Sequence, residues 1–242
     1  MKLTILETGL VPEPIRQDFE DYPAMFRRLI SAADPDIEYE TVSVITGEPL
    51  PDPASLDAVL ITGSPAGVYD DAPWIAPLMQ FIRDAAAARV PQIGICFGHQ
   101  ALAEALGGKV VKSEKGWGVG RHTYEMKACP DWTGGDCPET ISVPVSHQDQ
   151  VVALPPGARV IAASEFTPFA GLDYGEVPAM SFQCHPEFDP DYSAALYTIR
   201  KGRPLTEEAV KAAIEGLGHP LDNQRVGAWM AGFLRSAGQP KR

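Results

Sequence analysis

The sequence predicts an α/β protein with an open, mostly parallel sheet, helices on both faces, an antiparallel strand extension and C-terminal helices. In the first half of the chain, short apolar runs alternate with helix-like segments, which is typical of parallel strands joined by crossover helices. After Gly108 the character changes to short strand-like runs separated by Pro and Gly turns. The tail, about 205–236, returns to helical periodicity. We expect residues 1–242 to form a single domain of this class.

Each element is predicted by its apolar pattern and its flanking turn residues. Ile75, Leu78, Met79 and Ile82 recur at helical spacing after Pro73, a residue that favours the first turn of a helix. The expected order before residue 108 is strand 2–6, helix 22–33, strands 37–44 and 57–61, helix 74–88, strand 90–95 and helix 100–106. The strands expected afterwards are 110–113, 122–128, 140–145, 159–163 and 179–183.

The tail carries an apolar stripe at helical spacing. Its members are Val226, Trp229, Met230, Phe233 and Leu234. Such a stripe either packs on the core or binds a partner, and core packing is the more common use. We therefore expect the tail to pack back on the sheet.

Cys96 lies in the run Gly94-Ile95-Cys96-Phe97-Gly98, between an expected strand and an expected helix. A nucleophile on a strand-to-helix turn needs small neighbours where the backbone reverses. The free N–H groups and the dipole at a helix N-terminus favour a thiolate. The pattern predicts a nucleophilic Cys96, with the N–H of Phe97 as an oxyanion donor.

A base and an orienting carboxylate follow in the run His185-Pro186-Glu187. Residues i and i+2 of an extended strand point to the same face, so we expect His185 and Glu187 side by side. Glu187 would then hold the imidazole in one tautomer while His185 moves the proton during acyl transfer.

A second oxyanion donor is expected in the tight turn Gly63-Ser64-Pro65, which follows the apolar strand 57–61. Ligands of open α/β sheets bind at the carboxyl ends of the strands. The backbone amides of Gly63 and Ser64 would therefore face the same site as Cys96.

These motifs resemble the class I (triad) glutamine amidotransferase domain, and the likeness covers almost the whole chain. The run 146–151, which reads Ser-His-Gln-Asp-Gln-Val, resembles the segment near the substrate glutamine in GMP synthetase and related enzymes. In that family a cysteine attacks the side-chain amide of glutamine, ammonia leaves, and water cleaves the glutamyl thioester. The resemblance implies these catalytic roles for Cys96, His185 and Glu187.

The resemblance also implies contacts between Gln100, His147 and Asp149 and the α-amino acid end of the substrate. It implies no cofactor and no metal. One departure concerns Ser64, because many members have glycine there and serine adopts positive φ less readily. With serine at this position, the turn resembles that of stand-alone members of the family, a group that includes γ-glutamyl peptidases.

Three functions remain open at this stage. The first is a glutaminase-type hydrolase, acting alone or for a separate synthetase subunit, because 242 residues leave no room for an acceptor-activating domain. The second is a hydrolase of γ-glutamyl peptides or conjugates that uses the same triad. The third is an inactive binding or regulatory module, against which the intact triad argues.

Composition bounds the partners. Lys and Arg total 20 against 32 Asp and Glu, a net charge of −12, which argues against nucleic acid and anionic membrane surfaces as partners. No stretch approaches the length of a membrane span, and Glu7 interrupts the N-terminal apolar run, so we expect a cytoplasmic protein.

Four cysteines are too few for a disulfide framework. Cys129 and Cys137 could close a loop, and their spacing does not match a zinc site.

Overall fold

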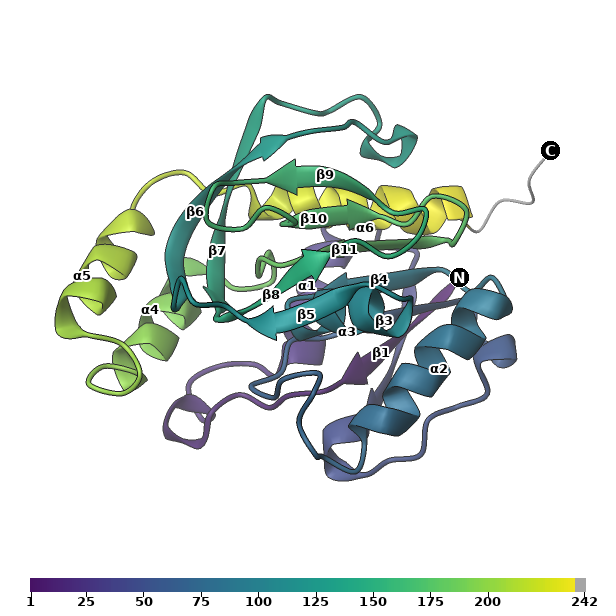
Figure 1. The fold of residues 1–242 in the computed structure, drawn as a ribbon, viewed down its shortest axis with the longest axis horizontal. Helices are drawn as coiled ribbons and strands as arrows, with labels where there is room; N and C mark the ends of the chain where they lie inside the picture. The colour runs from purple at the N-terminus through teal and green to yellow at the C-terminus, as the bar shows by residue number, and fades with distance from the viewer. Residues whose placement is uncertain (238–242) are drawn as a thin grey trace.

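A computed structural model describes residues 1–237 of the chain, and its main feature is a nine-stranded sheet in the order β2-β1-β3-β4-β11-β10-β9-β6-β7 (Figure 1). Each neighbouring pair from β2 to β11 is parallel. These parallel strands are β2 (Glu38–Ser43), β1 (Lys2–Glu7), β3 (Ala58–Ile61), β4 (Gln92–Ile95) and β11 (Ala179–Phe182). This half of the sheet confirms the expected parallel core.

The expected antiparallel extension is also present. Every pair from β11 outward to β7 is antiparallel, and β5 and β8 form a separate two-stranded antiparallel sheet. The strands concerned are β10 (Gly171–Asp173), β9 (Arg159–Ala163), β6 (Gly118–Met126), β7 (Thr140–His147), β5 (Lys109–Lys112) and β8 (Asp149–Ala153).

Helices cover both faces of the sheet because alternate residues of each buried strand point to opposite sides. Ala58 and Leu60 of β3 join a core that includes α1 (Tyr22–Ser31) and α6 (Asn223–Ala237). Val59 and Ile61 join a second core under α2 (Ile75–Ala87) and α3 (Phe97–Ala105). Figure 1 shows α2 and α3 in front of the strands and α6 behind them.

The tail packs on the core, as its apolar stripe predicts. It follows α4 (Pro190–Ile199) and contains α5 (Glu207–Gly216) and α6. The stripe residues of α6 belong to the same core as α1, and Trp229 is 1% exposed.

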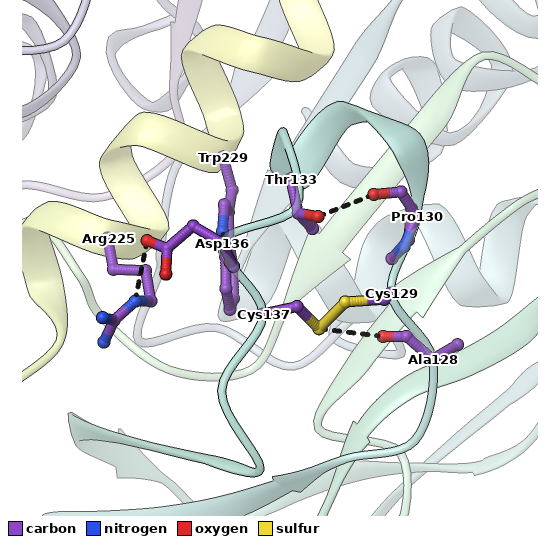
Figure 2. Close-up of a disulfide and its surroundings, with 8 residues drawn as sticks. All are labelled: Ala128, Cys129, Pro130, Thr133, Asp136, Cys137, Arg225 and Trp229. Carbon is purple, nitrogen blue, oxygen red and sulfur yellow. Dashed lines mark hydrogen bonds and ion pairs between the residues drawn. A yellow bond between two sulfur atoms is a disulfide. The ribbon is translucent and has the colours of Figure 1, made fainter.

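A disulfide links Cys129 and Cys137, so these residues close a loop, which is one of the two uses considered for them. Figure 2 shows the closed loop beside α6. The Trp229 indole donates to the Asp136 carbonyl at 2.9 Å, and Arg225 pairs with the Asp136 carboxylate at 3.0 Å. The loop is thereby attached to the tail helix.

Two kinds of expectation need correction. His185 and Glu187 do not lie on a strand, because β11 ends at Phe182 and the chain then turns, with the N–H of Phe188 donating to the His185 carbonyl at 3.2 Å. The sequence pattern also missed three elements, which are β8, β10 and α4. Within residues 1–237, no helix has the length and apolar character needed to cross a bilayer.

Candidate active site

Cys96 occupies a strained turn between β4 and α3. Its backbone has φ +53° and ψ −102°, and Arg89 is the other non-glycine residue with positive φ among those described. Positive φ is costly for a residue with a side chain and is found where the surrounding structure enforces it. The strain therefore falls on the cysteine itself, as in a nucleophile elbow.

The neighbouring glycines permit close packing rather than a reversal of the backbone. A Cβ on Gly98 would lie 2.2 Å from the carbonyl oxygen of Ile61, and a Cβ on Gly94 would lie 2.4 Å from the carbonyl oxygen of Gly98. Neither glycine has positive φ. The motif predicted the turn correctly, but the physical reason for its glycines is contact between β3, β4 and α3.

Phe97 is the first residue of α3, so its N–H has no acceptor within the helix. Cys96 is the N-cap residue, and its own N–H donates to the Phe182 carbonyl of β11 at 2.9 Å. This bond fixes the elbow relative to the strand that leads to His185. The free N–H of Phe97 and the sulfur of Cys96 are adjacent, as an oxyanion donor requires.

The imidazole of His185 donates a hydrogen bond from Nδ1 to the Glu187 carboxylate at Oε1, at 2.8 Å, and both side chains are buried. The ring stacks on Phe188, with 4.0 Å between centroids and 4° between planes. The backbone N–H of His185 donates to the Pro144 carbonyl at 2.9 Å. The expected contact between His185 and Glu187 therefore forms within a turn. The Glu187 carboxylate, the Phe188 ring and the Pro144 carbonyl of β7 hold His185 in place.

Charge around His185 favours its protonated form. Burial by itself lowers the pKa of His185, but the nearby charges of Cys96 and Glu187, together with hydrogen bonds to both, outweigh burial and raise that pKa to about 10. Such a pKa means that the His185 ring is an imidazolium near neutral pH.

The Gly63 turn lies against the same two side chains. A Cβ at Gly63 would be 2.9 Å from His185 Cε1 and 3.6 Å from Cys96 Cβ, so only glycine fits without displacement. The Thr8 hydroxyl, after β1, donates to the carbonyls of Thr62 and Gly63 at 3.0 and 3.3 Å. Ser64 does not have positive φ, so the serine introduces no backbone strain.

Gln100, His147 and Asp149 gather around one hollow of about 250 Å³ that also contains Cys96. The Gln100 amide donates to the Asp149 carbonyl at 3.0 Å, and His147 Nδ1 is 3.1 Å from the same oxygen. The Asp149 carboxylate accepts from the Tyr69 hydroxyl at 2.8 Å. We call this space the larger hollow. It brings together the three residues expected at the substrate's amino acid end.

His147 differs from His185 in charge. Burial, followed by the influence of His122, lowers the pKa of His147 to about 3, so its ring is neutral at physiological pH. A neutral imidazole in this position acts as a shape and hydrogen-bonding element of the wall rather than as a cation.

A second hollow, of about 60 Å³, lies on the His185 side of Cys96. Its walls include Leu10, Tyr22 and Leu196, which are largely apolar, and Arg200 lines both this space and the larger hollow. We call it the smaller hollow. Gln100, His147 and Asp149, which line the larger hollow, do not line the smaller one.

Sequence reasoning missed Arg200 because it missed α4, of which this residue is the C-cap. A signal was present in Asp189-Pro190: the Asp189 side chain caps the helix by accepting from the Tyr192 N–H at 2.8 Å, and proline follows at the first helical position. Thr8 was also missed, and the sequence gives no sign that a residue after the first strand supports the Gly63 turn. Among residues 1–237, no cluster of three potential metal-ligating side chains is present.

A comparison with family models matches residues 32–199 to glutamine amidotransferase class-I. The protein belongs to the class-I glutamine amidotransferase family. Members of this family are typically amidohydrolases with a cysteine nucleophile. The family match includes the Gly63 turn, Cys96, His185 and Glu187, and it ends one residue before Arg200.

The similar proteins have different names. A glutamine amidotransferase-like protein of Schizosaccharomyces pombe is 30% identical over 183 residues, which is 74% of this chain and 73% of the relative. Gamma-glutamyl peptidase 5 of Arabidopsis thaliana is 30% identical over 178 residues, 70% of each chain. A glutamine-hydrolyzing GMP synthase of Aromatoleum aromaticum is 36% identical over 135 residues, covering 53% of this chain but 25% of the synthase.

Solved structures show the same fold. A glutamine amidotransferase from Thermotoga maritima aligns over 99% of this chain and 98% of its own, with a TM-score of 0.75 and 20% identity. This likeness extends the fold assignment to the C-terminal helices, which lie outside the family match.

Proposed function

We propose that the protein hydrolyses the γ-carboxamide of glutamine through a thioester on Cys96. The observation that carries this proposal is the strained elbow of Cys96 beside an imidazole that Glu187 holds at 2.8 Å. A scaffold has no use for such strain, whereas an acyl-transfer enzyme needs a projecting nucleophile with a positioned base.

The reaction follows from these positions. The Cys96 thiolate attacks the γ-carbonyl carbon, and the developing oxyanion accepts hydrogen bonds from the N–H of Phe97 and from the Gly63–Ser64 turn. The imidazolium of His185 gives its proton to the nitrogen, the C–N bond breaks, and ammonia leaves. Water then attacks the thioester while His185 takes its proton, and glutamate departs as the thiolate re-forms.

The acyl half of the substrate would occupy the larger hollow. There the Asp149 carboxylate faces the α-ammonium group, while Gln100 and His147 shape the wall. No cofactor takes part in these steps. If ammonia is passed to an acceptor, a separate synthetase subunit would hold that acceptor.

The experiment compares ammonia release from glutamine by the parent protein and by Cys96→Ser. We expect a loss of about 10³-fold or more, because the weaker nucleophile cannot form the thioester at a comparable rate. A diazo-ketone glutamine analogue should form a single covalent adduct with the parent protein at Cys96, seen as an increase in intact mass. Equal turnover by the two proteins would refute the proposal.

Cys184 provides an internal control for the labelling. It is fully buried, and burial raises its pKa well above the ordinary value for a thiol, so it should remain unlabelled. Peptide mapping that places the adduct on Cys184 would contradict the assignment of Cys96.

A second candidate is hydrolysis of γ-glutamyl peptides by the same triad. It is favoured by the smaller hollow on the His185 side, where the leaving group departs, and by the similarity to gamma-glutamyl peptidase 5. Turnover of glutamine and of a γ-glutamyl dipeptide, measured side by side, separates the two candidates. Much faster cleavage of the dipeptide would make the second candidate the main activity.

A further inference from the structure

Arg200 is a half-buried cation at the point where the two hollows meet. Its guanidinium donates to the Ser146 hydroxyl and lies over the Trp117 ring, 5.2 Å from the centroid. Within residues 1–237, no carboxylate lies within ion-pair distance of it, although the chain carries a net charge of −12. Ser146 and Trp117 hold the side chain in place and leave its charge available to a ligand.

The larger hollow already contains a pair of charges suited to a free amino acid end. Lys112 of β5 lies opposite Asp149 of β8 in the strand register, and both line this hollow. A cation for the α-carboxylate and an anion for the α-ammonium group of a glutamyl moiety are thus available without Arg200. The positive charge of Arg200 is therefore available for another part of the substrate.

Arg200 also lines the smaller hollow, where it would contact a different part of the substrate. This space contains His185, which delivers the proton to the leaving nitrogen, so the leaving group must pass through it. Its other walls include the apolar side chains of Leu10, Leu196 and Phe188 and the ring of Tyr22. Ammonia needs neither an apolar wall nor a guanidinium, whereas an amino acid has an apolar body and a carboxylate that a guanidinium binds in a bidentate manner.

We propose that Arg200 binds the carboxylate of an amino acid leaving group, so that the substrates include γ-glutamyl amides of α-amino acids with a free α-carboxylate. The proposal rests on the Cys96 chemistry described above. The sulfur–carbon bond forms, the bond from the γ-carbonyl to the amino acid nitrogen breaks, and His185 protonates that nitrogen. The amino acid then leaves with its carboxylate still paired to Arg200, and water cleaves the thioester to give glutamate.

The test compares γ-glutamylalanine with γ-glutamylalaninamide, which differ only in the carboxylate assigned to Arg200. The parent should prefer the free acid by about tenfold to hundredfold in kcat/KM, the range of one hydrogen-bonded charge. Arg200→Met should bring this ratio to about 1, because it removes the charge that distinguishes the free acid from the amide. Arg200→Lys should keep part of the preference, since it keeps the charge without the planar fork.

Lys112→Met is the matched control. It removes a cation from the larger hollow only, so the ratio of acid to amide turnover should stay within about twofold of the parent value. An unchanged ratio in Arg200→Met would overturn the proposal. So would equal losses with glutamine and with both dipeptides, because they would place Arg200 at the glutamyl end or in a purely structural role.

Failure of the underlying chemistry can be recognised separately. If the parent hydrolyses none of these compounds, the Cys96 mechanism fails, and binding to Cys96→Ala protein still tests Arg200. Isothermal titration calorimetry with γ-glutamylalanine and its amide should show tighter binding of the acid, lost in the Cys96→Ala/Arg200→Met double variant. Equal affinities for acid and amide in Cys96→Ala protein would reject the Arg200 site.

Discussion

The two hollows that meet at Cys96 differ in chemistry and in their relation to the family. The larger one is polar, has a volume of about 250 Å³, and apart from Arg200 is lined by residues within the matched range 32–199. The smaller one has a volume of about 60 Å³ and is closed in part by Leu10, Pro12, Tyr22 and Arg200, all of which lie outside that range.

This difference indicates how one scaffold can serve several reactions. Binding of a glutamyl group and formation of a thioester need the elbow, the oxyanion turn and the larger hollow, which the family match includes. We propose that the identity of the leaving group depends on the smaller hollow, to which the segments before and after that match contribute Leu10, Pro12, Tyr22 and Arg200.

Among the changes that test this comparison, the largest effect is expected at Gly63, which lines the smaller hollow beside Cys96 and His185. A Cβ introduced by Gly63→Ala would meet His185 Cε1 at 2.9 Å and so displace the imidazole or the oxyanion turn. We expect kcat/KM to fall about 10²-fold for glutamine and for a γ-glutamyl dipeptide alike, because both reactions use these groups.

Gly216→Ala is the control for this substitution, since its Cβ would meet nothing closer than the Arg121 side chain, at 3.6 Å. Thermal unfolding of both variants checks that the fold is retained. Full activity of Gly63→Ala, or a loss confined to one substrate, would show that the turn is not shared by the two reactions.

A smaller effect is expected from Asp149→Asn in the larger hollow. The asparagine keeps an acceptor for the Tyr69 hydroxyl but loses the negative charge that would face the α-ammonium group. KM should rise about tenfold for glutamine and for the dipeptide, with little change in kcat, because this contact is equal in the ground and transition states. Steady-state kinetics on both substrates measures it.

Asp84→Asn, at an exposed carboxylate on α2, is the matched control and should leave both KM values unchanged. An effect of Asp149→Asn on the dipeptide alone would contradict the division of the site, because it would put Asp149 on the leaving-group side.

The parallel core and its carboxyl-end site were predictable because their signals are local. Apolar runs such as 57–61 end in a turn, and the Gly-x-Cys-x-Gly run needs no distant partner to be recognised. His185 and Glu187 were paired correctly for a wrong reason: i and i+2 spacing on a strand was expected, whereas a turn after β11 forms their contact.

The smaller hollow could not be predicted in this way. Beside the motif residues Cys96 and His185, it is assembled from the loop at Leu10, the start of α1 at Tyr22, α4 and Arg200, which are far apart in the sequence. Whether a cation has an acidic partner depends on tertiary packing across the whole chain, so the sequence cannot show that Arg200 has no such partner. Thr8 likewise acts through hydrogen bonds to residues 54 and 55 positions away.

The smallest expected effect concerns the charge states of the two histidines that border the hollows. His147 is neutral in the folded protein, with a pKa lowered to about 3, so the unfolded chain takes up a proton that the folded chain does not as pH falls below about 6.5. The stability that comes from neutral His147 should therefore be complete above about pH 6.5 and decline toward pH 3. In urea unfolding, the advantage of the parent over His147→Gln should shrink by about 1 kcal/mol or more between about pH 6.5 and 4.5, since one pKa unit corresponds to about 1.4 kcal/mol.

His219→Gln, at an exposed histidine, is the control and should show no such decline. His185 should behave in the opposite sense, because its pKa is raised to about 10. NMR of the ring nitrogens should show an imidazolium at His185 throughout about pH 5 to 8 and a neutral ring at His147. Two rings that titrate together near about pH 6.5 would mean that Cys96 and Glu187 do not stabilise a charged His185, and the electrostatic contrast between the hollows would be lost.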